Sequence, residues 1–323
     1  MSNARYHPTA MLQFLIRRVL AVIPVLLVVA VVVFLILRLT PGDPAAVIAG
    51  NSATLEDIAN IRKSLGLDQS LLTQFFIWFK GVLTGDLGHS FYYRLPVTEL
   101  IGQRLEPTMA LAACTILFAV LVAVPLGVLA AWKHGSWFDR SLMGFSVLGF
   151  SIPVFVLGYI LIWLISLKMN LLPVQGYKRI GEGLWPFISH LILPTVTLGV
   201  IYVALIARVT RAAVSEALTE DYIRTARSKG LPELRVLIRH ALANAAVPIV
   251  TVIGIGVALL IGGVVVTETV YAIPGLGQLT VDAVLARDFP VVQGLILFFS
   301  VAYVLINLLV DISYIIFDPR IRY

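Results

Sequence analysis

One charged segment, residues 215–242, holds the side chains best placed to do chemistry. Acidic and basic residues alternate there within an otherwise apolar half of the chain. Ser215 is suited to cap a helix that ends at Gly230, since glycine readily adopts the left-handed conformation found after a helix. Pro232 suits the first turn of a second helix, because its missing N–H is not needed there. The segment therefore predicts a helix, a sharp turn and a second helix. Its charged side chains could form ion pairs with a partner surface that docks against it.

Motifs for catalysis and for metal binding are absent from the sequence. It contains neither the phosphate-binding pattern Gly-x-x-x-x-Gly-Lys-Ser/Thr nor the zinc pattern His-Glu-x-x-His. The five histidines are scattered without metal-ligand spacing, and the one cysteine, Cys114, lies in an apolar run. We therefore predict no catalytic residue, no metal site and no cofactor bound by this chain.

The elements that must position the charged segment are membrane-spanning helices. Hydrophobic residues make up 59% of the chain and charged residues only 13%, whereas a soluble domain carries about 25% charge. A helix needs about 20 apolar residues to cross the hydrocarbon core. Six stretches without Asp, Glu, Lys or Arg are long enough: residues 19–37, 107–132, 141–167, 183–207, 240–267 and 289–310. The sequence thus predicts an all-α integral membrane protein with six transmembrane helices.

The basic residues of the short loops predict the orientation. Most of them fall on the face that holds both termini and the 215–242 segment, and this bias marks the cytoplasmic side. The same bias accounts for the formal net charge of +6 without a nucleic-acid partner. The first apolar run is too long for a signal-peptide core and lacks a cleavage site, so we expect it to be retained as the first span.

A long segment between the first two spans, residues 40–103, is predicted to be a periplasmic insertion. It opens with a Pro-Gly-Asp-Pro turn at 41–44, and helices are expected over 54–65 and 71–83. The aromatic residues of the second helix suit an interfacial belt or a platform for an external partner. The chain divides accordingly into 1–39, the insertion 40–103 and a five-span core 104–323.

Few ionisable residues fall within the spans. Glu106, Glu268 and Asp311 lie close to predicted span ends and are interpreted as interfacial charges or helix caps. His190 and Asn307 lie deeper and are interpreted as packing polar groups. Because a proton-coupled carrier usually has ionisable residues in mid-span, the energy for any transport would come from elsewhere.

Prolines and glycines in the spans indicate bends and close packing. Pro153, within a Ser-Ile-Pro sequence, and Pro125 are expected to kink the third and second spans. Four glycines should allow close helix approach in the fifth span, namely Gly254, Gly256, Gly262 and Gly263.

Residues 220–230 resemble the cytoplasmic signature of the permease subunits of bacterial ABC importers. The general signature is Glu-Ala-Ala, three residues, then Gly; here Arg224, Thr225 and Ala226 stand at the first three positions and Gly230 at the last. Only the second Ala and the Gly match. The departures resemble the dipeptide/oligopeptide/nickel branch of these permeases. Segments 38–44, 268–278 (with 287–290 following) and 318–323 are similar to that branch as well, in the same order.

The resemblance implies a subunit that pairs with a second, related permease in the bacterial inner membrane. Two cytoplasmic ATPases would bind ATP and Mg below it, and a periplasmic solute-binding protein would deliver solute from above. The coupling helix, within residues 215–230, would contact the ATPase through Glu220, Asp221, Tyr222, Ile223, Arg224, Thr225, Ala226, Arg227, Ser228, Lys229 and Gly230. A second motif, in a periplasmic loop, comprises Glu268, Pro274, Gly275 and Gly277.

Within that contact, Tyr222 and Ile223 are expected to be apolar anchors, and Arg224, Arg227 and Lys229 to pair with acidic residues of the ATPase. An alternative interpretation is that the arginines only reflect cytoplasmic topology.

The function implied is import of di- or oligopeptides, with nickel chelates, glutathione or opines as alternative solutes of the same kind of importer. A stand-alone channel or secondary carrier would need mid-span charges or inverted repeats, and neither is visible in the sequence. A membrane-embedded enzyme would need a set of catalytic residues inside the bilayer, and it is the least favoured of these alternatives. A DNA-binding helix-turn-helix is disfavoured because the segment is tethered between two spans.

Overall fold

The computed structural model describes residues 8–39, 45–46, 54–64 and 66–317. The turn predicted at 41–44 and the motif at 318–323 lie outside these residues, as does most of the motif at 38–44. The described residues form helices joined by turns, with one isolated β-bridge between His89 and Pro96. They group into two compact units, one of residues 1–106 and 278–305 and the other of 107–277 and 306–323. The three-part division by topology stays a prediction.

The first unit contains α1 (Pro8–Leu39), α3 (Leu55–Ser64) and α4 (Leu71–Leu83), together with most of α12 (Leu276–Leu285). It also includes the beginnings of α5 (Val97–Trp132) and α13 (Phe289–Phe317). Both helices predicted in the 40–103 segment are confirmed, and α4 has the predicted bounds.

The aromatic residues of α4 divide between packing and exposure. The ring of Phe34 in α1 lies 5.4 Å from that of Phe75 and 5.7 Å from that of Trp78. The side chain of Phe76 remains 65% exposed. Phe75 and Trp78 therefore attach α4 to the first predicted span.

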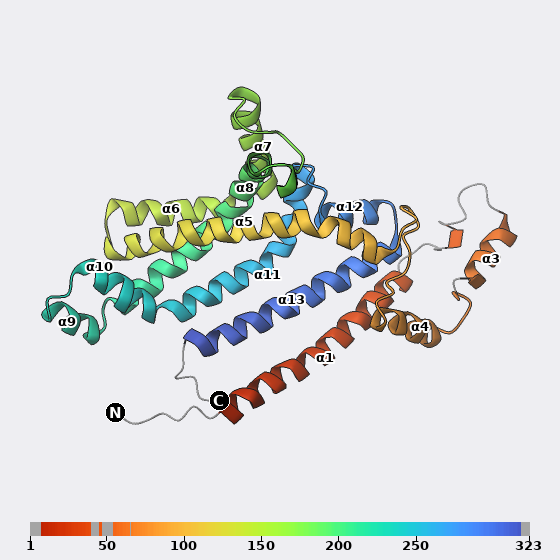
Figure 1. Ribbon diagram of the computed structural model, residues 1–323, viewed down its shortest axis with the longest axis horizontal. Coiled ribbons are helices and arrows are strands. Elements are labelled where there is room, and N and C mark those ends of the chain that lie inside the picture. The colour runs from red at the N-terminus through yellow and green to blue at the C-terminus, as the bar shows by residue number, and fades with distance from the viewer. Residues whose placement is uncertain (1–7, 40–44, 47–53, 65, 318–323) are drawn as a thin grey trace. The chain divides into compact units, whose positions relative to one another are not determined.

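The second unit is built around α8 (Leu184–Ala217), which packs against α6 (Trp137–Ser151), α7 (Val154–Leu161) and α11 (Ala246–Val270) (Figure 1). Two thirds of the most apolar stretch of α8 is buried, against one third for α11. The core between these helices is mostly aliphatic and includes Leu198, Val203 and Ile206 of α8.

Four described helices are long and apolar enough to cross a membrane: α5, α8, α11 and α13. A fifth candidate span is the pair of α6 and a helix over residues 154–168, whose last part, Ile162–Lys168, is a π-helical turn. The chain is therefore an all-α membrane protein.

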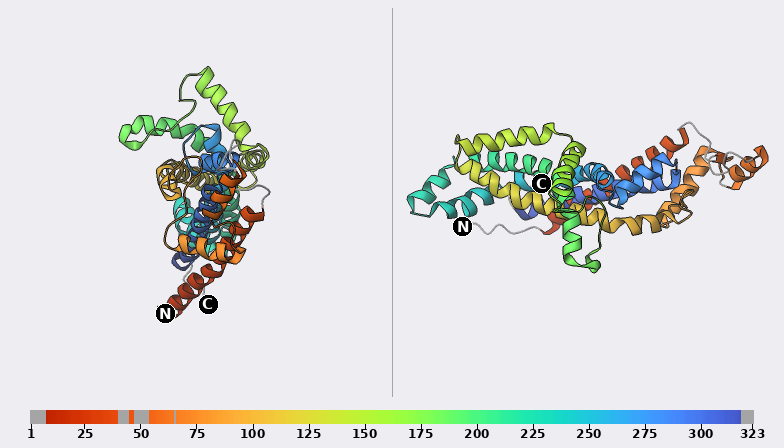
Figure 2. Two further views of the ribbon diagram at one scale, coloured as in Figure 1. Left: turned by 90° about the vertical axis from the view of Figure 1, so that its right-hand side faces the viewer. Right: turned by 90° about the horizontal axis from the view of Figure 1, so that it is seen from above.

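The third predicted span is broken rather than kinked. Its two halves are bent by 102°, and Figure 2 shows α7 turning away from α6. Pro153 disfavours helical geometry at Ile152, whose φ and ψ are −88° and 121°. Pro125, by contrast, lies within an uninterrupted α5.

Close helix approach in α11 is confirmed at three of the predicted glycines, including Gly256, where a Cβ would lie 3.3 Å from the Tyr202 ring. A Cβ at Gly254 would lie 2.3 Å from the Val310 side chain, and one at Gly263 would lie 2.8 Å from Leu198. Gly262 differs, because a Cβ there would meet nothing within 4 Å.

An ion pair that the sequence did not suggest fastens α6 to α8. The Arg211 guanidinium donates to both carboxylate oxygens of Asp139, at 2.6 and 2.8 Å. The same carboxylate accepts the backbone N–H of Gly135 at 2.9 Å. Because the Asp139 side chain is only 4% exposed and that of Arg211 22%, the pair is mostly shielded from water and fixes the 133–136 loop on α8.

Removing the carboxylate of Asp139 is expected to destabilise the chain, because Arg211 would lose its acidic partner and the Gly135 N–H its acceptor. We expect Asp139→Ala to cost about 1–3 kcal/mol of unfolding free energy, measured as a lower melting temperature of the purified chain in detergent. Asp221→Ala is the matched control: it breaks the exposed pair with Arg224, at 3.5 Å, and should cost less than about 1 kcal/mol. Equal shifts for the two variants would contradict this account.

Candidate functional site

The candidate site is the elbow, defined here as residues 218–242, which follows α8 and leads into α11. It contains α9 (Asp221–Ser228), α10 (Glu233–Arg235) and a π-helical turn (Val236–Leu242). Figure 1 shows it beyond the ends of α8 and α11. The prediction that Ser215 caps this helix is wrong. Ser215 lies inside α8, which continues to Ala217 because Val214 and Ala217 extend its buried face.

The turn of the elbow confirms the prediction for Gly230, whose φ is +73°. The N–H of Gly230 donates to the carbonyl of Arg227 at 2.9 Å, and the N–H of Leu231 to that of Ala226 at 3.3 Å. These two bonds are those of a Schellman motif, which ends a helix with a left-handed residue. Pro232 then caps α10 instead of lying in its first turn.

An ion pair within the elbow joins α9 to α10. Arg227 Nη2 donates to Glu233 Oε1 at 2.6 Å, and Arg227 Nε to Oε2 at 3.2 Å. The hydrogen bonds that Arg227 donates to the Glu233 carboxylate raise the pKa of Arg227 above its usual value. Arg227 therefore has its acidic partner in the same elbow, whereas we expected that partner in another chain.

The elbow has a buried face that attaches it to the rest of the second unit. Ile223 is fully buried and Ala226 nearly so, in a cluster that includes Val214 of α8 and Val236 and Ala241 of the π-turn. The expectation that Ile223 offers an apolar contact to a partner is wrong, because its position in α9 directs it inward.

The exposed face of the elbow combines charged and apolar side chains. Asp221 and Arg224 are exposed, and the Tyr222 side chain is 39% exposed. Leu234 and Ile238 are also exposed, at 68% and 54%. The sequence reasoning missed these two, although their spacing of four residues after Pro232 places them on one helical face.

The second predicted motif forms a buried carboxylate node at the other end of α11. Glu268 is fully buried. Its Oε1 accepts the Thr108 hydroxyl at 2.6 Å, and its Oε2 accepts the Gly277 N–H at 2.7 Å. Thr108 Oγ1 in turn accepts the N–H of Leu276 at 2.8 Å. The interpretation of Glu268 as an interfacial charge or a cap is wrong, because the loop folds back over it.

Gly275 and Gly277 lie against this carboxylate, where a larger residue would not fit. A Cβ at Gly275 would lie 2.1 Å from Glu268 Oε1, and one at Gly277 would lie 2.5 Å from the Cα of Val265. Pro274 directly precedes Gly275 and is partly buried. The structure thus brings Glu268, Gly275 and Gly277 together, and the two glycines leave the space that the carboxylate occupies.

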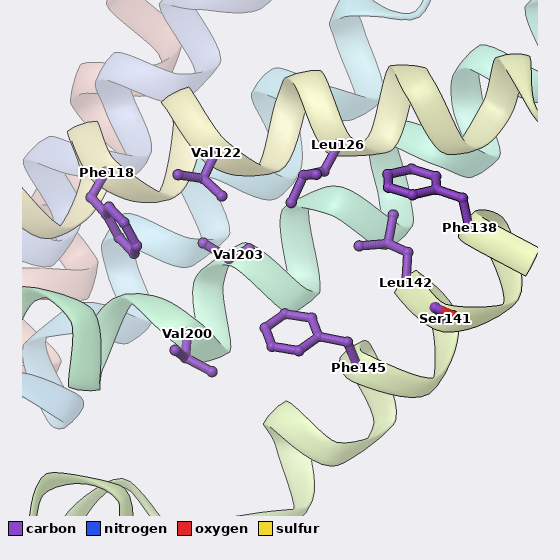
Figure 3. A pocket seen from close by; sticks show the side chains of 9 residues that line it. All are labelled: Phe118, Val122, Leu126, Phe138, Ser141, Leu142, Phe145, Val200 and Val203. Atoms are coloured by element: carbon purple, nitrogen blue, oxygen red, sulfur yellow. The ribbon is translucent and has the colours of Figure 1, made fainter. Parts of the chain in front are cut away.

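Groups for bond-making chemistry are not gathered in the described residues. No group of three or more His, Cys, Asp or Glu residues there could hold a metal ion. His190 Nδ1 lies 2.7 Å from the Pro186 carbonyl oxygen, as expected of a packing polar group. A cavity of about 320 Å³ between α5, α6 and α8 is apolar except for one hydroxyl (Figure 3); it is lined by Phe118, Val122, Leu126, Phe138, Ser141, Leu142, Phe145, Val200 and Val203.

Comparison with known families decides the class of the protein. Residues 123–323 match the family "Binding-protein-dependent transport system inner membrane component", and residues 11–112 match the N-terminal region of such components. The chain belongs to this family. It is a multi-pass inner-membrane permease of an ABC importer, a transport component that works with an ATPase and further transporter components, and not an enzyme.

Relatives match over nearly the whole chain. The probable peptide ABC transporter permease protein y4tP of Sinorhizobium fredii is 53% identical, over 96% of this chain and 99% of its own. The dipeptide transport system permease protein DppB of Escherichia coli is 41% identical, over 97% and 99%. A putative peptide transport system permease protein of Brucella abortus is 44% identical, over 97% and 100%.

A solved structure shares the fold. Inward-facing MetNI, a methionine ABC transporter, aligns with a TM-score of 0.57 at 20% identity, covering 68% of this chain and 96% of that one.

The glycine beside Glu268 provides a test of the buried node. Gly275→Ala adds a methyl group where the carboxylate lies, and overpacking of this kind costs about 1–3 kcal/mol. We expect a lower melting temperature of the purified chain in detergent. Gly262→Ala, in open space on α11, is the control and should not lower the melting temperature, because alanine is the better helix former. If Gly275→Ala and Gly262→Ala had equal melting temperatures, the steric explanation would be refuted.

Proposed function

We propose that this chain is the permease subunit of an ATP-driven importer that passes di- or oligopeptides from a periplasmic solute-binding protein into the cytoplasm. The observation that carries the proposal is the identity of 41–53% over at least 96% of the chain to permeases named for peptides or dipeptides. This favours peptides over nickel chelates, glutathione or opines. It also disfavours a stand-alone channel or carrier.

The proposed topology has six spans: α1, α5, the broken pair of α6 and α7, α8, α11 and α13. Five of these are supported by length and composition, and α1 contributes the shorter apolar stretch Leu20–Leu35 among residues whose side chains are described. Both termini and the elbow would be cytoplasmic, and residues 40–103 periplasmic. The node of Glu268 would then lie on the periplasmic side.

The proposed partners are a second, related permease, two cytoplasmic ATPases and the binding protein, with lipid around the spans. The ATPases would bind ATP and Mg, since this chain is expected to bind no cofactor. The elbow would lie on one ATPase through its exposed face, which includes Tyr222, Arg224 and Lys229 and, from α10 and the following turn, Leu234 and Ile238.

The geometry of the elbow suggests how movement would pass into the membrane. Because Ile223 and Ala226 are buried against α8 and the π-turn, an ATPase that moves α9 would also move the adjoining ends of α8 and α11. ATP-driven closure of the ATPase pair would thus change the packing of the spans and open the pathway to the other side.

Copurification tests the proposed function most simply. The chain would be tagged, extracted gently from native membranes, and its partners identified by mass spectrometry. We expect a second permease and ATPase subunits, and ATP-dependent peptide uptake once the complex and its binding protein are reconstituted in vesicles. A chain that purifies alone and moves solute without ATP would overturn the proposal.

Substitution of Gly230 tests the coupling role of the elbow. A β-branched residue is strained in the left-handed region by about 1–2 kcal/mol, so Gly230→Val should distort the Schellman turn. We expect uptake to fall roughly tenfold or more while ATP hydrolysis and the amount of protein in the membrane are retained. Gly230→Asn is the control, because asparagine adopts this conformation most readily after glycine. Wild-type uptake by the valine variant would exclude this role for the elbow.

A further inference from the structure

The helix α4 carries exposed apolar side chains to which neither the family nor the sequence motifs assign a role. Leu72, Phe76 and Leu83 are between 65% and 71% exposed. Their spacing of four and seven residues places them on one helical face. This face is called the α4 stripe below. Large apolar groups gathered in this way mark a surface that something else covers in the assembled protein.

The opposite face of α4 is covered by polar segments of the same unit. Gln74 and Gly81, seven residues apart, lie on that face. Gln74 Nε2 donates to the carbonyls of Leu67 and Gln69 at 3.2 and 2.9 Å, and the Gly81 carbonyl accepts the N–H of Asp86 at 2.9 Å. The loops before and after α4 therefore pack on one side of the helix, and the α4 stripe points away from them.

The contact with α1 gives the depth of α4 relative to the membrane. The aromatic rings of α4 pack on Phe34, five residues before Leu39, the last residue of α1. Five residues correspond to about 7 Å of helix, and Arg38 ends the apolar run of α1 within that distance. Figure 1 shows α4 beside this end of α1. Val28 and Val32, within two turns before Phe34, are exposed as well. α4 thus lies where the apolar surface of the first span ends.

The charge on α4 specifies the chemistry of what covers the stripe. Lys80 is the one charged residue among the 13 of this helix, and it is exposed. It follows Phe76 by four residues, which places it beside the α4 stripe. A lysine in this position lays its apolar stem along hydrocarbon and reaches anionic groups with its ammonium. Apolar groups with a cation beside them match the acyl chains and the phosphate of a phospholipid.

We propose that α4 is an interfacial helix, whose stripe lies among lipid acyl chains at the membrane surface beside α1, with Lys80 at the lipid phosphates. The surface is the periplasmic one by the proposed topology, on which this inference rests. Lipid contact holds α4 and the loops packed on it at a fixed depth. The exposed aromatic side of α4 is then a membrane anchor and not a platform for the binding protein.

Photo-cross-linking identifies what touches the stripe. The photoreactive residue p-benzoylphenylalanine would replace Phe76 or, as the control, Asp68 in the exposed loop before α4. The assembled complex would be irradiated in vesicles of phosphatidylethanolamine and phosphatidylglycerol, with and without its binding protein, and the adducts identified by mass spectrometry. We expect a phospholipid adduct at position 76 in both conditions and none at position 68. An adduct of position 76 with the binding protein or a second permease, no lipid adduct there, or equal lipid adducts at both positions would overturn the inference.

A charge placed in the stripe tests whether the whole helix depends on lipid contact. With the photoreactive residue at position 83, we expect Phe76→Asp to lower the yield of lipid adduct roughly tenfold, because a carboxylate is costly to bury among acyl chains. Phe76→Leu keeps an apolar group and should retain the yield. Because Phe76 is exposed, both variants should fold, which equal melting temperatures in detergent would verify. An unchanged yield for the folded aspartate variant would contradict the proposal.

Uptake assays on the same complex separate this inference from the proposed function. ATP-driven peptide uptake without a lipid adduct at position 76 would leave the function standing and remove the interfacial helix. A lipid adduct at position 76 without ATP-driven uptake would keep the interfacial helix and reject the peptide-import function.

Discussion

The elbow depends on one buried contact, that of Ile223 and Ala226 with the end of α8 and the π-turn before α11. Burying an isoleucine side chain contributes about 1.5–3 kcal/mol, which is large for a helix of 8 residues that could not persist alone. The Schellman turn at Gly230 and the Arg227–Glu233 pair then set the angle between α9 and α10. Without the buried face, these local interactions would set the shape of the elbow but would not fix its orientation relative to α8 and α11.

The same unit places its two motifs at opposite ends of one helix. α11 begins after the elbow and ends just beyond Glu268. With 25 residues it is about 37 Å long, enough to cross the hydrocarbon core. The loop over Glu268 is fixed by a buried carboxyl group whose oxygens would be costly to bury without their hydrogen bonds from Thr108 and Gly277. A displacement of the elbow along α11 would therefore reach a tightly hydrogen-bonded loop at the other end of that helix.

Much of this architecture could be predicted from local patterns. The bounds of α4, the end of α3 before Gly66 and the left-handed Gly230 follow from apolar periodicity and from glycine chemistry, which are properties of short segments. What failed depended on tertiary contacts. Ser215 is a good cap by type, yet the buried face of α8 continues past it. The sequence suggests that Ile223 is available for contact with a partner, but its side chain lies in the buried cluster beneath the elbow. Glu268 meets Thr108 across 160 residues, which no local pattern shows. Pro153 predicted a bend in the third span, but the angle of that bend depends on how each half of the span packs.

We expect the elbow to move together with the second unit and not as a separate lever, because Ile223 and Ala226 are buried against that unit. The distance between spin labels attached at positions 133, in the loop after α5, and 229, in the elbow, measures this directly in the reconstituted complex with Cys114 replaced by serine. Both sites are exposed and belong to that unit. We predict one narrow distance distribution that is the same with and without ATP. A distribution that broadens or shifts when ATP binds would contradict the claim and show that the elbow hinges on its own.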